Sequence, residues 1–144
     1  MNRGFEISQK VSLAYRKICK PLCSEVDLAQ TAFDILMFLG NNPECNTARD
    51  IVEIRHIKAN LVSVHVERLV EEGYLLRRPV KADRRKTELI CTQRALPIIE
   101  RGRLLQKTFI ERLLAGMDEA ARQAFASALY GIEQNIDAIL EEDV

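Results

Sequence analysis

The sequence of 144 residues lacks the patterns that mark most enzymes and membrane proteins. It contains no Gly-rich phosphate-binding loop, no H-E-x-x-H metalloprotease motif and no G-x-S-x-G nucleophile turn. No apolar run reaches the roughly 18 residues that a transmembrane helix needs, and the first ten residues lack the apolar segment of a secretory signal. We therefore expect a cytoplasmic protein with no catalytic residue set, no cofactor and no membrane contact.

Cysteine and histidine are also too few to suggest a metal centre. Cys19 and Cys23 lie one helical turn apart on one face, which allows a redox pair or half of a metal site. The alternative is that both are buried small hydrophobes. Zinc requires about four ligands, and a reactive thiol requires an electropositive surrounding, for which Arg16, Lys17 and Lys20 are the nearby candidates. In a reducing cytoplasm all the cysteines should remain thiols.

Composition and charge favour one globular folding unit with a basic middle. Hydrophobic residues make up 47% of the chain and charged residues 29%, which is ordinary for a folded domain. The formal net charge is zero, yet residues 55–94 hold ten Lys or Arg against five Asp or Glu. Residues 1–54 hold six against seven, and residues 95–144 hold five against nine. Such clustering is typical of a nucleic-acid-binding surface, although a solvated hairpin gives the same signal.

Three helices are predicted before the basic segment. Apolar residues spaced by three and four predict a helix over residues 5–23, which Pro21 should kink or end. Residues 30–39 are apolar nearly all round, which is typical of a buried helix. Thr47, followed three residues later by Asp50, predicts the capped start of a short third helix.

A turn near residues 55–56 leads to a helix over residues 58–72 that has two different faces. At 100° per residue, Val62, Val66 and Leu69 fall on one side and form the predicted core face. In a major groove, an asparagine on the outer face can pair with adenine, and apolar side chains can pack on thymine methyl groups. The alternative is that the apolar residues of this outer face are buried against another element. The outer face consists of Asn60, Leu61, Ser63, Val64, Glu67 and Arg68.

Two short apolar runs around a basic loop follow this helix. Gly73 is expected to end the helix, because glycine tolerates a positive φ angle. Residues 74–78 and 87–91 are predicted to be the two strands of a hairpin, a wing whose loop is residues 79–86. A wing arginine can enter a narrow minor groove, and arginines at the wing base can reach phosphates. The cations available are Arg77, Arg78, Lys81, Arg84, Arg85 and Lys86.

The C-terminal third is predicted to be helical. Thr92 is expected to cap a helix that runs to about residue 115, where Gly116 ends it. Asp118 is expected to cap the last helix. That helix carries an apolar seam with spacings of four and three, which is typical of a helical partner or of packing against residues 5–23. The seam consists of Phe125, Leu129, Ile132, Ile136 and Ile139.

This order of elements and several motif residues resemble the MarR family of multiple-antibiotic-resistance-type regulators. The family's wing signature D-R-R…L-T is similar to Asp83, Arg84 and Arg85 followed by Cys91 and Thr92. The resemblance implies a mainly α fold with a small β-wing, a winged helix-turn-helix flanked by N- and C-terminal dimerisation helices. It also implies a homodimer that binds a pseudo-palindromic operator in double-stranded DNA, usually as a repressor released by a small ligand or by oxidation. The upstream part of the family pattern is matched by Val62, Val66, Arg68, Leu69, Gly73, Arg77 and Arg78.

The resemblance also implies roles for particular residues and segments. Arg85 corresponds to the arginine of the minor groove, and Asp83 corresponds to a residue that braces the wing through a salt bridge. Residues 1–39 and 96–144 correspond to the dimerisation region. Residues 40–95 correspond to the winged helix-turn-helix, in one continuous folding unit.

The leading hypothesis is a sequence-specific transcription regulator that binds double-stranded DNA. The alternatives are a winged-helix module that docks a protein through the outer face of helix 58–72, and a thiol-based redox sensor that uses Cys19 and Cys23. The chain departs from the family pattern at Val64, where a basic or polar residue is common, and at His65, where the residue is usually apolar. This histidine is expected to be a hydrogen-bonded structural residue or a contact at the groove edge. The predicted DNA-binding residues are Lys58, Asn60, Leu61, Ser63, Val64, Arg68, Arg77, Arg78, Arg84, Arg85 and Lys86.

Overall fold

A computed structural model of the protein describes residues 2–143, which form two compact units. The first unit ends at Lys107 and the second begins at Thr108, within helix α5 (Leu96–Leu113). The chain is mainly helical with one two-stranded antiparallel sheet, so the predicted fold class is confirmed. Within the described residues, no helix is both long enough and apolar enough to cross a bilayer.

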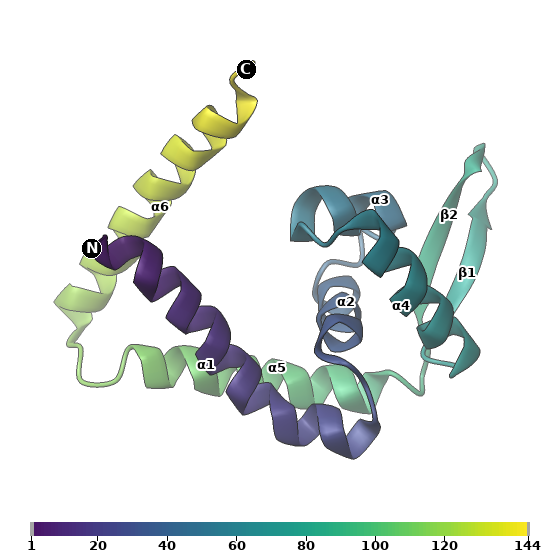
Figure 1. Ribbon diagram of the computed structural model, residues 1–144, viewed down its shortest axis with the longest axis horizontal. Coiled ribbons are helices and arrows are strands. Elements are labelled where there is room, and N and C mark those ends of the chain that lie inside the picture. The colour runs from purple at the N-terminus through teal and green to yellow at the C-terminus, as the bar shows by residue number, and fades with distance from the viewer. Residues whose placement is uncertain (1, 144) are drawn as a thin grey trace. The chain divides into compact units, whose positions relative to one another are not determined.

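Helix α2 is the centre of the first unit. It contacts α1, α4 and β2, and Figure 1 shows it between the α1 and α5 helices and the elements α3 and α4. The hairpin of β1 and β2 extends beside α4, and its tip stands clear of the helices of this unit (Figure 1). The elements are α1 (Arg3–Val26), α2 (Gln30–Asn41), α3 (Ala48–Asp50), the π-helix η1 (Ile51–Arg55), α4 (Ala59–Glu71), β1 (Leu75–Val80), β2 (Asp83–Cys91) and the first part of α5.

The hydrophobic core surrounds α2 because this helix is apolar on nearly every side. Seven of its twelve residues are buried, which confirms the prediction of a helix enclosed by neighbours. Side chains from α1, η1, α4, α5 and the base of the hairpin join it in the core, and several of them are at most 1% exposed. Among these are Cys19, Ile51, Val62, Leu69, Leu75 and Ile99.

Helix α1 continues through Pro21 to Val26, so the helix does not end at the proline, and the alternative that the proline kinks it stays a prediction. An interior proline costs about 3 kcal/mol because it removes one hydrogen bond and crowds the preceding turn. The turns after Pro21 carry Leu22 and Cys23 into the core, and this burial offsets the cost. The helix ends instead at Asp27, which has a left-handed backbone with φ of 55°.

Helices α2 and α5 approach closely at a glycine. A Cβ atom on Gly40 would lie 2.8 Å from Cγ2 of Ile99, and Ile99 is itself buried. We expect Gly40→Ala to lower the free energy of unfolding by about 1–3 kcal/mol, because overpacking outweighs the better helix propensity of alanine. Urea denaturation measures the change. In an Ile99→Ala background, which opens the space, Gly40→Ala should cost much less, and an equal cost in both backgrounds would contradict the close approach.

The helix-turn-helix begins with a reciprocal cap. The Asp50 N–H donates to Thr47 Oγ1 at 3.1 Å, and the Thr47 N–H donates to Asp50 Oδ2 at 3.2 Å, which confirms the predicted cap. The short α3 runs directly into η1. His56 follows with a left-handed backbone of φ 61°, which places the turn where the sequence predicted it.

The wing strands are longer than predicted. Strand β2 starts at Asp83, so Arg84, Arg85 and Lys86, which were assigned to a loop, lie in a strand, and the turn shrinks to residues 81–82 with Lys81. Leu75 pairs with Cys91 at the base, and Val80 pairs with Asp83 at the tip. The register shifts between Pro79 and Val80, because proline has no N–H to give to the ladder.

Thr92 does not cap the helix that follows the wing. Its hydroxyl donates to the Gly73 carbonyl oxygen at 2.6 Å, and α5 begins only at Leu96. This hydrogen bond ties the end of β2 to the end of α4, where Gly73 has the expected positive φ of 84°. The threonine therefore fixes the base of the wing instead of starting a helix.

The second unit contains the end of α5 and all of α6 (Glu119–Glu141). Gly116 has a φ of 84°, and Asp118 Oδ1 accepts a hydrogen bond from the Ala121 N–H at 2.8 Å, so the predicted break and cap are confirmed. No residue of α6 is buried. The five seam residues are between 46% and 63% exposed, so this helix presents an apolar stripe that lacks a cover.

Candidate nucleic-acid interface

Helix α4 has the two faces that the sequence predicts. Val62, Val66 and Leu69 are at most 4% exposed and anchor the helix to the core. On the opposite face, Leu61 is 40% exposed and Val64 is 63% exposed, so the alternative that they are buried against another element of the chain is wrong. The polar members of that face, Asn60, Ser63, Glu67 and Arg68, are also exposed.

The start of α4 is open to an anionic partner. Lys58 occupies the cap position of α4. Its ammonium group is a donor only, so no side chain caps the N–H groups of the first turn. The first N–H groups of a helix carry partial positive charge and bind phosphate well when no side chain caps them. Lys58 is exposed at this end and adds a full positive charge.

Three of the predicted phosphate-binding arginines are held by carboxylates. Arg68 Nε donates to Glu72 at 2.9 Å, Arg77 Nη2 donates to Glu67 at 2.8 Å, and Arg78 Nη2 donates to Glu88 at 2.6 Å. Arg68 also lies 3.7 Å from Asp27. Exposed ion pairs of this kind stabilise a fold by less than about 1 kcal/mol, so a phosphate can compete for each arginine. Their net positive charge is nonetheless reduced.

The wing cations have no such partners. Arg84, Arg85 and Lys86 are exposed and form no ion pair with any residue of the described chain. Within the described residues Asp83 forms no ion pair, so the salt bridge that the resemblance implied is not found there. Its Oδ1 instead accepts the backbone N–H of Arg85, two residues later in the same strand, at 3.0 Å. The guanidinium groups of Arg84 and Arg85 remain available to DNA.

Sequence reasoning missed a hollow beside the wing that brings charged residues of α3, η1 and β2 together. Arg49, Arg85 and Lys86 line it with the carboxylates of Asp50, Glu53 and Asp83, and its volume is about 630 Å³. Arg49 also pairs with Glu53 at 2.8 Å. The residue lies far from the wing in the sequence, so only the packing of β2 beside α3 brings these cations together. In the sequence, Arg49 is marked only as a cation two residues after the helix cap Thr47.

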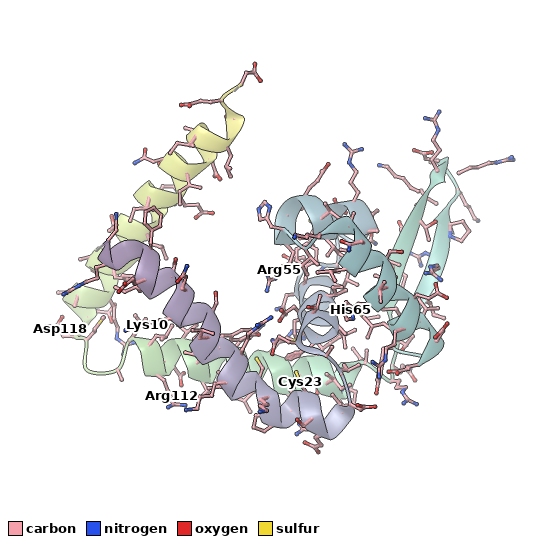
Figure 2. All side chains as sticks on the ribbon, viewed as in Figure 1. Lys10, Cys23, Arg55, His65, Arg112 and Asp118 are labelled. Carbon is pink, nitrogen blue, oxygen red and sulfur yellow. The ribbon has the colours of Figure 1, made fainter. Side chains whose placement is uncertain are left out.

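A partly buried carboxylate that sequence reasoning also missed links α2 to the helix-turn-helix. Asp34 Oδ2 lies 3.6 Å from Arg55 Nη2, and Arg55 points from the end of η1 toward α2 (Figure 2). Burial raises the pKa of Asp34, while Gln30 and Arg55 act to lower it. The pair ties the end of the first helix of the motif to the central helix.

His65 is not the hydrogen-bonded structural residue that was predicted. It lies half-buried on α4 (Figure 2), and its Nδ1 atom is buried with no hydrogen-bond partner among the described residues. Two of its neighbours on the helix, Val62 and Leu69, are buried aliphatic residues that offer no hydrogen bond. The alternative of a groove-edge contact remains a prediction.

The two cysteines of α1 lie in the core. Cys19 is fully buried and Cys23 is 7% exposed, as expected for small hydrophobes. Burial raises the pKa of both thiols, and that of Cys23 to about 11. Within the described residues, no group of three or more His, Cys, Asp or Glu side chains is placed to hold a metal ion. A redox role for the pair stays a prediction, and the low thiolate content disfavours it.

This burial predicts slow thiol chemistry. At neutral pH we expect iodoacetamide to modify Cys23 and Cys19 more than about tenfold more slowly than in the unfolded chain, because the raised pKa keeps the thiols protonated and burial blocks access. Mass spectrometry of tryptic peptides measures each rate. The half-buried Cys45 serves as an internal reference. Labelling of Cys19 or Cys23 ahead of Cys45 in the native protein would support a sensing role instead.

Comparison with known proteins agrees with this arrangement. Residues 26–86 match the model of the MarR family. A Listeria monocytogenes protein assigned to that family, in complex with 26mer DNA, has 19% sequence identity and a TM-score of 0.83 over 94% of this chain and 90% of its own. A MarR protein from Peptoclostridium difficile has 18% identity and a TM-score of 0.83, with 95% and 89% covered. The transcriptional regulator SlyA has 15% identity and a TM-score of 0.83, with 97% and 98% covered. No curated protein matches the sequence.

Proposed function

We propose that this chain is a MarR-family transcription regulator that binds double-stranded DNA sequence-specifically, and the match of residues 26–86 to the family model and the similar folds support this. The observation that carries the proposal is the pairing of an exposed helix face on α4 with unpaired wing cations. Such a helix fits a major groove, and a cationic wing fits the adjacent minor groove. The similar Listeria monocytogenes structure in complex with 26mer DNA supports it.

The binding unit is a homodimer in this proposal. The stripe of α6 is exposed at every seam position, and no residue of this helix is buried. A lone amphipathic helix in water is marginal, so a cover for its apolar face is needed. A second copy supplies an identical seam, and the resulting two-fold axis suits a pseudo-palindromic operator with half-sites about one helical turn apart. Residues 1–39 and 96–144 form the dimerisation region, and residues 40–95 form the DNA-binding region.

The regulator is a repressor whose DNA binding responds to a small effector. One hollow of about 660 Å³ in the first unit is lined by the cations of Arg16, Lys20 and Arg68, by the single carboxylate of Asp27 and by the start of α2. Helix α2 has no side-chain cap at this end, so its first N–H groups add to the positive potential. An anionic effector fits this chemistry better than a cation. Occupation of the hollow would bias the position of α4, since Arg68 belongs to that helix.

Selection from a pool of random duplexes tests the function. The purified protein is incubated with the pool at two salt concentrations, and the bound DNA is sequenced. We expect one enriched two-fold symmetric site and a steep loss of affinity with salt, since several phosphates are neutralised. No enrichment, with weak binding even at low salt after removal of small molecules, would favour the protein-docking alternative. An apolar docking face would also show little dependence on salt.

A further inference from the structure

Two branched apolar side chains stand on the outer face of α4. Leu61 and Val64 are three residues apart, so they lie on adjoining turns of one face, and both are substantially exposed. Helix formation does not account for the valine, since it is a weaker helix former than alanine or a long polar residue. Core packing does not account for either, because the core face consists of Val62, Val66 and Leu69. Their apolar surface is available to a partner.

The neutral polar groups on the same face are matched to adenine rather than guanine, and its acidic member, Glu67, already accepts a hydrogen bond from Arg77. Arginine paired with guanine is the commonest base contact, yet Arg68 is turned toward Glu72 and Asp27. Asn60 and Ser63 supply neutral side chains in the first two turns, and an asparagine amide pairs with the adenine edge. Lys58 precedes the first turn in an extended backbone, outside this face.

The surrounding charge favours DNA over an apolar protein as the occupant. The unpaired wing cations Arg84, Arg85 and Lys86 belong to the hairpin that lies beside α4 (Figure 1). An apolar helix face in a unit that also carries a cationic hairpin suits a polyanion that presents methyl groups within a groove. Thymine is the one DNA base that does so, through its C5 methyl group.

We propose that Leu61 and Val64 determine specificity by packing on thymine methyl groups, so that the central bases read by α4 form an A·T-rich step. This inference rests on the proposed DNA-binding function and adds the base chemistry to it. Removal of one buried methyl group changes affinity by about fourfold. A two-fold symmetric operator contains each position twice. Removal of the methyl group from both symmetric thymines should therefore lower affinity by about fifteenfold.

Deoxyuridine substitution tests the inference on the full chain. Deoxyuridine differs from thymidine only by the missing C5 methyl group, so the Watson–Crick edges stay unchanged. Each symmetric pair of thymines in the selected operator is replaced in turn, and binding is measured by fluorescence anisotropy. We expect about fifteenfold weaker binding at one or two pairs and no change at pairs outside the α4 footprint. Equal affinity for every substituted duplex would overturn the inference.

Protein variants assign the methyl contact to its side chain. Val64→Ala and Leu61→Ala should each bind the unsubstituted operator more weakly. In each variant, deoxyuridine at the thymine that the missing side chain would contact should cause no further loss of affinity. Ser63 lies on the same face, and the Ser63→Ala variant should still lose the full fifteenfold in affinity on deoxyuridine substitution. A penalty that persists in both apolar variants would overturn the assignment. Salt-dependent binding without a methyl effect would reject this inference alone, whereas an absence of DNA binding would reject the proposed function with it.

Discussion

The double substitution Arg84→Ala, Arg85→Ala is expected to weaken operator binding by on the order of a hundredfold while the fold stays intact. Both guanidinium groups are exposed near the tip of the wing, and neither is paired with a carboxylate of the described chain. A dimer would lose four cations from its DNA-facing surface. The slope of the logarithm of affinity against the logarithm of salt should therefore fall by up to about 4.

The matched control for this effect is Arg78→Ala in the same hairpin. Arg78 is held by Glu88 through its Nε and Nη2 atoms at 2.9 and 2.6 Å, so its charge is largely neutralised before DNA arrives. We expect its removal to cost much less affinity and to change the salt slope little. Circular dichroism checks that both proteins fold. An equal loss in the two variants would show that the free tip cations have no special role.

Local features of this chain were predictable because short stretches determine them. The reciprocal cap of Thr47 and Asp50 and the positive φ of Gly73 each depend on a few neighbouring residues. The two faces of α4 follow from helical periodicity alone. The residues predicted for the core face are buried, and Leu61 and Val64 of the predicted outer face are exposed. These features locate the candidate interface without any tertiary information.

Features that depend on packing were not predictable from the same stretches. Pro21 signals a helix end, and only the burial of the following turn in the core explains why α1 continues. The basic loop became strand because Val80 and Asp83 pair across a two-residue turn. The hollow that joins Arg49 to the wing depends on segments distant in sequence. The ion pair between Arg77 and Glu67 likewise forms only because the hairpin packs beside α4.

Ile132→Glu is expected to convert the protein into a monomer and to abolish binding to a two-fold symmetric operator. Ile132 lies in the middle of the α6 seam and is 53% exposed within one chain, so the charge is tolerated in the isolated subunit. In a dimer the carboxylate would be buried without a partner, at a cost of several kcal/mol for each copy. The dissociation constant of the dimer should rise by more than about a thousandfold.

Sedimentation analysis and operator binding measure this prediction, and Gln134→Glu is its control. Gln134 is about 200° around the helix from Ile132, so the control adds the same charge to the opposite face of α6. It should remain dimeric and bind the operator normally. A dimeric Ile132→Glu protein would show that the seam is not the interface and that another partner covers α6. A monomer that still binds the operator tightly would instead separate dimerisation from DNA recognition, since each half-site would then be bound by an independent copy.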